Sequence, residues 1–229
     1  MENIFIILLG LSMLYLASTS RLKAHINMLV IQGWLLFLIC ILGLANEEWF
    51  NINVFRDMKD NWTHICAIAF VTLETLGVKA LIIPLVLNKV LKKTRAHRDS
   101  DANIPHFYSL VISSLILFAG FMIANIQTPA LKIISPLYFG VSVSIIITSL
   151  WSITIKRTVL SNVISFITME NGIFLLSLAA AKEMPVIVNL GVLLDIFIAV
   201  FVLGMLVKEI NTEFENLEIS QLSELKDYE

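Results

Sequence analysis

Four ionisable residues lie near the middle of long apolar segments of this chain. Glu170 and Asp195 are each central to their own segment, whereas Glu74 and Lys79 straddle the middle of a third. A charge at the centre of a membrane costs about 2.5–3.5 kcal/mol on insertion scales, so each of these groups must face protein or water. Three carboxyls and a lysine at one depth, bridged by water, are what a lateral proton relay requires. We therefore predict that these four residues form a proton or ion relay.

The same charges could instead form structural ion pairs that set helix packing and register. Glu74 and Lys79 are five residues apart, about 140° around an α-helix, so each is expected to pair with a different neighbour. The polar residues that can hold bridging water near this depth are Gln32, Ser165, Thr168 and Asn171. Pro84 has no backbone N–H and predicts a kink, or a freed carbonyl, near Lys79 and Ala80.

The elements that carry these residues are membrane helices by composition. Hydrophobic residues make up 58% of the 229 residues and charged residues only 15%, and the mean hydropathy is +0.86. These values are typical of polytopic membrane proteins. A spanning helix needs about 20 mostly apolar residues. The qualifying segments are residues 4–20, 26–44, 64–88, 106–124, 134–155, 159–181 and 186–207. The sequence predicts an all-α integral membrane protein with seven transmembrane helices, the first of which is retained because no signal-peptide features precede it.

Basic residues are distributed unevenly between the two sides of these helices. Eleven fall on one side: Arg21, Lys23, Lys89, Lys92, Lys93, Arg95, Arg98, Lys156, Arg157, Lys208 and Lys226. The other side carries Arg56, Lys59, Lys132 and Lys182. The positive-inside rule then places the N-terminus outside and the C-terminus inside, which agrees with an odd number of helices.

Helices one to three and five to seven resemble two copies of one unit. In each copy the first two helices are joined by a short basic connection, and a polar group lies about three turns into the second helix, Gln32 in the first copy. An even number of crossings separates equivalent helices, so the repeat is parallel. We predict a first three-helix unit at 1–95, a linking helix with its loops at 96–133, a second unit at 134–208, and a cytoplasmic tail at 209–229.

Sites for other chemistry are sparse in this sequence. Cys40 and Cys66 both lie in apolar segments, where a small buried hydrophobe is the simplest interpretation. Two cysteines are too few for the usual four-thiolate iron–sulfur site, and no metal-ligand spacing links the four histidines. No phosphate-binding glycine loop or nucleophile–base arrangement is present. We predict no catalytic residue, metal or cofactor in this chain, and no nucleic-acid partner.

Several segments resemble component E of hydrogenase-4-type nickel–iron hydrogenase complexes. They are residues 156–160, the Met-Glu-Asn-Gly motif at 169–172, residues 195–200, the Lys-x-x-x-x-Pro stretch within 78–84, and the tail at 217–226. The last three helices also resemble subunit K of respiratory complex I and the C subunit of Mrp-type antiporters.

These resemblances imply a non-catalytic, multi-pass subunit of a prokaryotic inner-membrane complex. Its expected partners are antiporter-like membrane subunits and peripheral, hydrogenase-like redox subunits, in an oxidoreductase that couples redox chemistry to ion translocation. Glu170 matches the glutamate in the second helix of subunit K, and Asp195 lies about where that family has its third-helix acid. The alternatives are a subunit of a multi-component cation/proton antiporter and a purely structural membrane scaffold.

Overall fold

In the part of the chain that the computed structural model describes, the regular elements are six α-helices and one π-helical segment. The structure describes residues 2–46, 73–94, 105–125, 135–156 and 158–180, together with Gly204. The chain divides into two compact units, Met1–Val192 and Leu193–Glu229, and every element described here lies in the first. In chain order they are α1 (Glu2–Ser18), α2 (Leu22–Asn46), the π-helix η2 (Leu73–Ile82), α5 (Ile83–Thr94), α6 (His106–Ala124), α7 (Pro136–Ile155) and α8 (Val159–Ala180).

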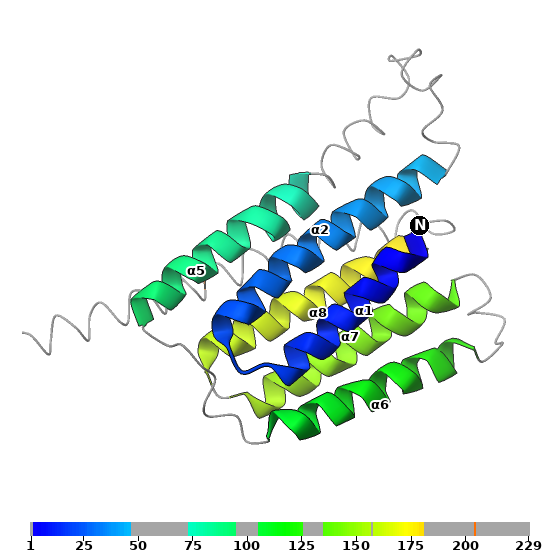
Figure 1. The fold of residues 1–229 in the computed structure, drawn as a ribbon. Helices are drawn as coiled ribbons and strands as arrows, with labels where there is room; N and C mark the ends of the chain where they lie inside the picture. The colour runs from blue at the N-terminus through cyan, green and yellow to red at the C-terminus, as the bar shows by residue number, and fades with distance from the viewer. Residues whose placement is uncertain are drawn as a thin grey trace, which may run out of the picture. The chain divides into compact units, whose positions relative to one another are not determined.

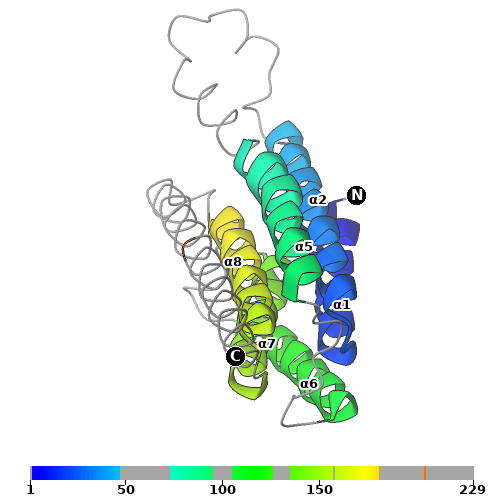
Figure 2. The ribbon, with the colours of Figure 1, turned by 90° about the vertical axis from the view of Figure 1, so that its left-hand side faces the viewer.

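The helices of this first unit pack side by side around α1 and α2 (Figure 1). Helix α1 contacts α2, α6 and α7, and α7 lies between α6 and α8. Helix α2 contacts η2, α5 and α8, and Figure 2 shows α5 alongside α2. The hydrophobic core lies where α1, α2, α7 and α8 meet. It includes Ile6, Leu9, Leu36, Ile145 and Leu175, all with almost no exposed surface.

Four of the described helices are long and apolar enough to cross a membrane. They span Leu22–Leu42, Phe107–Ala124, Pro136–Ile155 and Val159–Leu178, and α1 contributes a shorter apolar helix, Asn3–Ser18. Large apolar side chains cover the outer face of α6, where Phe107, Leu115 and Phe118 are all more than half exposed. An apolar surface of this kind suits lipid, since lipid tails do not penalise exposed hydrocarbon. Seven spans and their orientation stay predictions.

The helix bounds agree closely with the apolar segments where both are described. Helix α6 has the predicted bounds, α7 begins two residues later than predicted, and α8 ends one residue earlier. The third predicted helix, 64–88, is described only from Leu73, and it continues beyond Asn88 to Thr94. Apart from Gly204, the seventh predicted helix lies outside the described residues, as does the tail.

The described part of the third helix is π-helical over Leu73–Ile82 and α-helical from Ile83, one residue before Pro84. Proline lacks an N–H, and in an α-helix its ring collides with the carbonyl four residues earlier, here that of Ala80. Wider π turns, with hydrogen bonds between residues five apart, relieve that collision. They also bring positions five apart toward one face of the helix. The predicted angle of about 140° between positions 74 and 79 is therefore wrong, because it assumed α-helical geometry.

A buried histidine closes the turn between α1 and α2. The Nε2 atom of His25 lies 3.1 Å from the carbonyl oxygen of Leu16 and 3.0 Å from that of Thr19. Carbonyls in the last turn of a helix have no hydrogen-bond partner within the helix. A side-chain donor at this position therefore gives the carbonyls at the end of α1 a hydrogen-bond partner. His25 has no exposed surface, and its role is structural.

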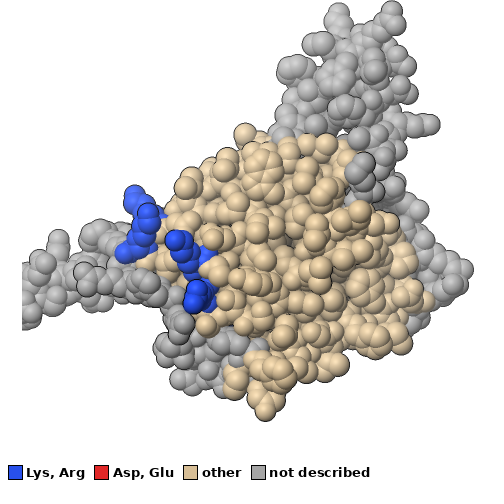
Figure 3. Space-filling model, viewed as in Figure 1, with Lys and Arg blue, Asp and Glu red and all other residues tan. Residues whose placement is uncertain are grey.

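The described basic side chains gather at one end of the helices. The α1–α2 turn, the α7–α8 turn and the end of α5 all lie at this end (Figure 1). They carry Arg21, Lys23, Lys89, Lys92 and Lys156. Figure 3 shows the blue basic atoms concentrated there, and no acidic atom of a described residue is seen in this view. Among the described lysine and arginine side chains, Lys79 is the exception, since it lies in the interior.

Candidate functional site

Lys79 of η2 and Glu170 of α8 form a buried ion pair between two helices. The Nζ atom of Lys79 lies 3.8 Å from Oε1 of Glu170, and the two side chains are only 2% and 1% exposed. Each charge thus supplies the partner that the other requires in an apolar setting. The residues are 91 positions apart in the chain, so only tertiary packing brings them together.

An aromatic ring from α8 completes the surroundings of the lysine. The Nζ atom of Lys79 lies 4.4 Å from the centroid of the Phe174 ring. Phe174 is one turn beyond Glu170, so one face of α8 presents both the carboxylate and the ring. A cation held against an aromatic face gains about 2 kcal/mol when it is desolvated. Two groups of different chemistry that both attract a cation therefore flank the lysine amine.

A chain of polar side chains crosses from α8 to α1 beside this ion pair. The Nδ2 atom of Asn171 donates to Oε1 of Gln32 at 3.1 Å, and Nε2 of Gln32 donates to Oγ of Ser12 at 2.9 Å. Ser12 in turn donates to the carbonyl of Leu9. Gln32 and Asn171 therefore bond directly to each other. The side-chain acceptor of the same asparagine, Oδ1, is buried and has no hydrogen-bond partner among the described residues.

Glycines allow the helices to approach closely at this level. A Cβ atom on Gly33 would lie 3.0 Å from the backbone of Ala80, the neighbour of Lys79. A Cβ atom on Gly172 would lie 2.9 Å from the side chain of Ile145. Small residues at such contacts let membrane helices pack backbone to backbone. Gly33 follows Gln32 in the chain and Gly172 follows Asn171. The close contacts at the two glycines therefore set the distance between the helices that carry these polar side chains.

Two of the four predicted relay residues thus form one site. Glu74 lies in η2 by its backbone, while its side chain is outside the described part of the structure. Asp195 is also outside the described residues. The ion pair joins the third helix of the first predicted unit to the second helix of the second unit. Among the described residues, no three His, Cys, Asp or Glu side chains come together as metal ligands.

Sequence reasoning missed Ser12, Phe174 and the π-helix. Ser12 is one of many hydroxyl residues in the apolar helices, and nothing in its local sequence distinguishes it. Phe174 could have been found from its spacing of four residues from Glu170, since such residues share a helix face. Pro84 was the available signal for the irregular helix, because a proline inside an apolar segment demands a local adjustment.

Comparison with known proteins identifies bacterial relatives. Hydrogenase-4 component E of Escherichia coli strain K12 is 26% identical over 167 residues, which cover 70% of this chain and 71% of that protein. The protein of the same name from Shigella flexneri matches equally well. The uncharacterized protein Rv0085 of Mycobacterium tuberculosis is 25% identical over 181 residues, 77% of this chain and 79% of that protein. No family profile and no solved structure matches the chain.

These matches agree with the resemblance carried by the Met-Glu-Asn-Gly motif and its flanking segments. They cover most of both chains, and the described helices are those of a multi-pass membrane protein. This chain is a distant homologue of hydrogenase-4 component E.

Proposed function

We propose that this chain is a non-catalytic membrane subunit of a hydrogenase-type complex and that Glu170 and Lys79 belong to its proton or ion relay. The observation that carries the proposal is the buried ion pair between η2 and α8. Homology to hydrogenase-4 component E supports membership in such a complex. Asp195 and Glu74 remain predicted members of the same relay.

The energetics of the pair favour a relay over a purely structural role. Two buried charges lose their hydration, and their attraction compensates for this only when the geometry is very good. Replacing such a pair by hydrophobic residues is often neutral or stabilising. A separation of 3.8 Å between Nζ and Oε1 is long for a hydrogen-bonded ion pair. Stability alone therefore does not account for two charges at this depth, whereas proton transfer requires ionisable groups there.

The surroundings of the pair suit proton transfer between helices. A second polar group, Asn171, follows Glu170 directly and bonds across to Gln32. The carboxylate, the lysine and these amides place polar atoms from three helices at one level. Water held between such groups can pass protons laterally through the membrane to neighbouring subunits. Those neighbours would be antiporter-like membrane subunits, with redox chemistry in peripheral subunits.

The distribution of basic residues supports the proposed orientation in a bacterial inner membrane. The end that carries the α1–α2 and α7–α8 turns holds the exposed basic side chains and would face the cytoplasm (Figure 3). The proposed topology has the N-terminus outside and seven spans, as the apolar segments of the sequence predict. The lipid bilayer would contact the apolar outer face of α6.

The test compares four forms of the complex in inverted membrane vesicles: wild type, Glu170→Gln, Lys79→Met and the double variant. Proton uptake is followed with a pH-sensitive dye while reduced viologen drives hydrogen production. We expect Glu170→Gln to abolish proton uptake, whereas the complex that still assembles should, once solubilised, produce hydrogen at a largely unchanged rate per molecule. Normal proton uptake in Glu170→Gln would refute the relay role.

The double variant separates a relay from a scaffold. Removing both charges leaves no unpaired charge in the membrane, so assembly should recover relative to either single variant. A relay predicts that proton uptake stays absent in the recovered complex. A purely structural pair predicts that assembly and proton uptake recover together. Ser114→Ala, which changes an exposed hydroxyl on α6, is the control for unspecific effects on assembly.

A further inference from the structure

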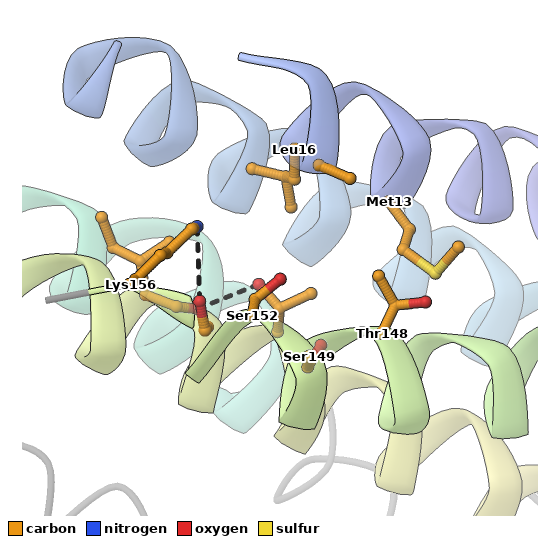
Figure 4. A pocket seen from close by; sticks show the side chains of 10 residues that line it. Met13, Leu16, Thr148, Ser149, Ser152 and Lys156 are labelled. Atoms are coloured by element: carbon orange, nitrogen blue, oxygen red, sulfur yellow. Dashed lines mark hydrogen bonds between the residues drawn. The ribbon is translucent and has the colours of Figure 1, made fainter. Parts of the chain in front are cut away.

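A small pocket that neither Lys79 nor Glu170 lines lies between α1, α7 and α8 (Figure 4). Met13 and Leu16 of α1 face α7 across it. The other walls carry hydroxyl groups. They come from Thr148, Ser149 and Ser152 of α7 and from Ser165 and Thr168 of α8. Lys156, at the end of α7, lines the pocket on the side of the basic end.

Two hydroxyls in this wall are buried without a partner in the described structure. Thr148 and Ser149 are 3% and 2% exposed, and neither Oγ1 of Thr148 nor Oγ of Ser149 makes a hydrogen bond with a described residue. Buried hydroxyls are nearly always hydrogen-bonded, to protein or to ordered water. A small polar space with several hydrogen-bonding groups is the setting in which buried water is held. The pocket therefore has room for about one water molecule.

Lys156 lines the pocket on the side of the basic end of the helices. The Nζ atom of Lys156 donates to Oγ of Ser165 at 3.4 Å, and this hydroxyl donates to the carbonyl of Ser161. Thr168 likewise donates to the carbonyl of Ile164. The hydroxyl oxygens of Ser165 and Thr168 keep lone pairs that can accept hydrogen bonds from water. The lysine thus connects the basic end of the helices to the hydroxyl-lined space.

The hydroxyls on α8 lead toward the buried ion pair. Residues 161, 165, 168 and 171 are three or four apart, so Ser161, Ser165, Thr168 and Asn171 lie along one face of the helix. Asn171 is one helical turn beyond the pocket, about 5 Å along the axis, and adjoins Glu170. On the opposite wall, Met13 adjoins the Ser12 that accepts a hydrogen bond from Gln32. The pocket and the polar cluster therefore share two helices.

We propose that this pocket holds a water molecule on a path of hydroxyl groups by which protons reach Glu170 from the end of the helices where α7 meets α8. The path rests on the proposed relay function of Glu170. Water and hydroxyl groups each accept a proton from one neighbour and donate one to the next, so one proton moves inward and none is consumed. Lys156 stands at the outer end, and Asn171 orients the water nearest to the carboxylate.

The first test measures whether water reaches the pocket, independently of transport. Thr148→Cys and Ser149→Cys are made in the whole complex with Cys40 and Cys66 changed to alanine. Membranes are treated with Ag⁺, a small thiol-reactive cation, and unmodified thiol is then labelled with a maleimide after denaturation. Ile147→Cys and Leu150→Cys are the controls, since Ile147 and Leu150 are 44% and 49% exposed on the apolar side of the same helix.

Silver should modify the pocket thiols at least about tenfold faster than the control thiols, because a charged solute enters hydrocarbon only at a high cost. Equal rates at the pocket and control positions would overturn the path. Faster modification at the pocket would support it, even in a Glu170→Gln background without translocation. Hydration and relay are thus measured separately.

The second test removes the unpartnered hydroxyls and measures proton uptake by the complex in vesicles. Thr148→Val combined with Ser149→Ala should slow proton uptake at least about tenfold, since positioned proton carriers speed transfer by about 10²–10⁴-fold. Assembly should be unchanged or improved, because the removed hydroxyls bond no described residue. Unchanged proton uptake in this variant, with uptake abolished in Glu170→Gln, would overturn the path and leave the relay standing. Ser114→Ala is again the matched control.

Discussion

The coupling between Lys79 and Glu170 can be measured as a free energy with a double-mutant cycle. The perturbations are Lys79→Met and Glu170→Gln, made singly and together, in the purified chain. At a separation of 3.8 Å and an effective dielectric constant of about 20, Coulomb's law gives an attraction of about 4 kcal/mol. Breaking a buried pair by removing one partner costs about 3–5 kcal/mol, because one charge stays buried without its counter-charge.

These magnitudes predict an unusual order of stability. With about 3 kcal/mol lost in each single variant and a coupling of about 4 kcal/mol, the double variant should lose only about 2 kcal/mol. It should therefore be more stable than either single variant. Because the pair is shielded from solvent, the coupling should change little with ionic strength.

The assay is reversible unfolding in mixed micelles at increasing dodecyl sulfate, followed by helical circular dichroism. Each variant gives one free energy of unfolding, and the four values give the coupling. A coupling below about 1 kcal/mol, the range of exposed ion pairs, would refute the argument that Lys79 and Glu170 interact through a medium of low dielectric constant. Ser114→Ala should leave the free energy of unfolding within about 0.5 kcal/mol of wild type.

Two further predictions concern packing and the first turn. Gly33→Ala should lower the free energy of unfolding by about 1–3 kcal/mol, because its Cβ would lie 3.0 Å from the Ala80 backbone. The control Gly77→Ala should cost much less in the same unfolding assay, since the nearest described atoms there belong to the Leu73 side chain, 3.9 Å or more away. Equal losses in the two variants would contradict the close contact at Gly33. His25→Ala should lower the free energy of unfolding by about 1–3 kcal/mol, because buried carbonyls lose their hydrogen-bond donor. His25→Gln should recover part of this loss, because glutamine retains an N–H donor. A comparison of the thermal midpoints of the two variants checks this.

Much of the fold follows from the sequence because membrane helices obey a local rule. A long apolar segment must satisfy its own backbone hydrogen bonds, and a helix does so without help from distant residues. The bounds of α6, α7 and α8 were for this reason predictable to within two residues. The need of Glu170 for a polar partner was equally predictable, since it depends only on depth and charge.

The identity of that partner was decided by the tertiary structure. The direction in which Lys79 points depends on the π-helical turns before Pro84, and α-helical spacing gave the wrong angle for this segment. The approach of η2 to α2 depends on the contact between Gly33 and Ala80.

The sequence by itself therefore determined the helices, their apolar character and the presence of charges that require partners. Only tertiary structure decided that Lys79 meets Glu170, that Gln32 bonds to Asn171, and that hydroxyls of α7 and α8 surround one pocket. The physical reason is the range of the interactions. Hydrogen bonding within a helix links residues a few positions apart, whereas these contacts link residues up to 139 positions apart and depend on how every intervening helix packs.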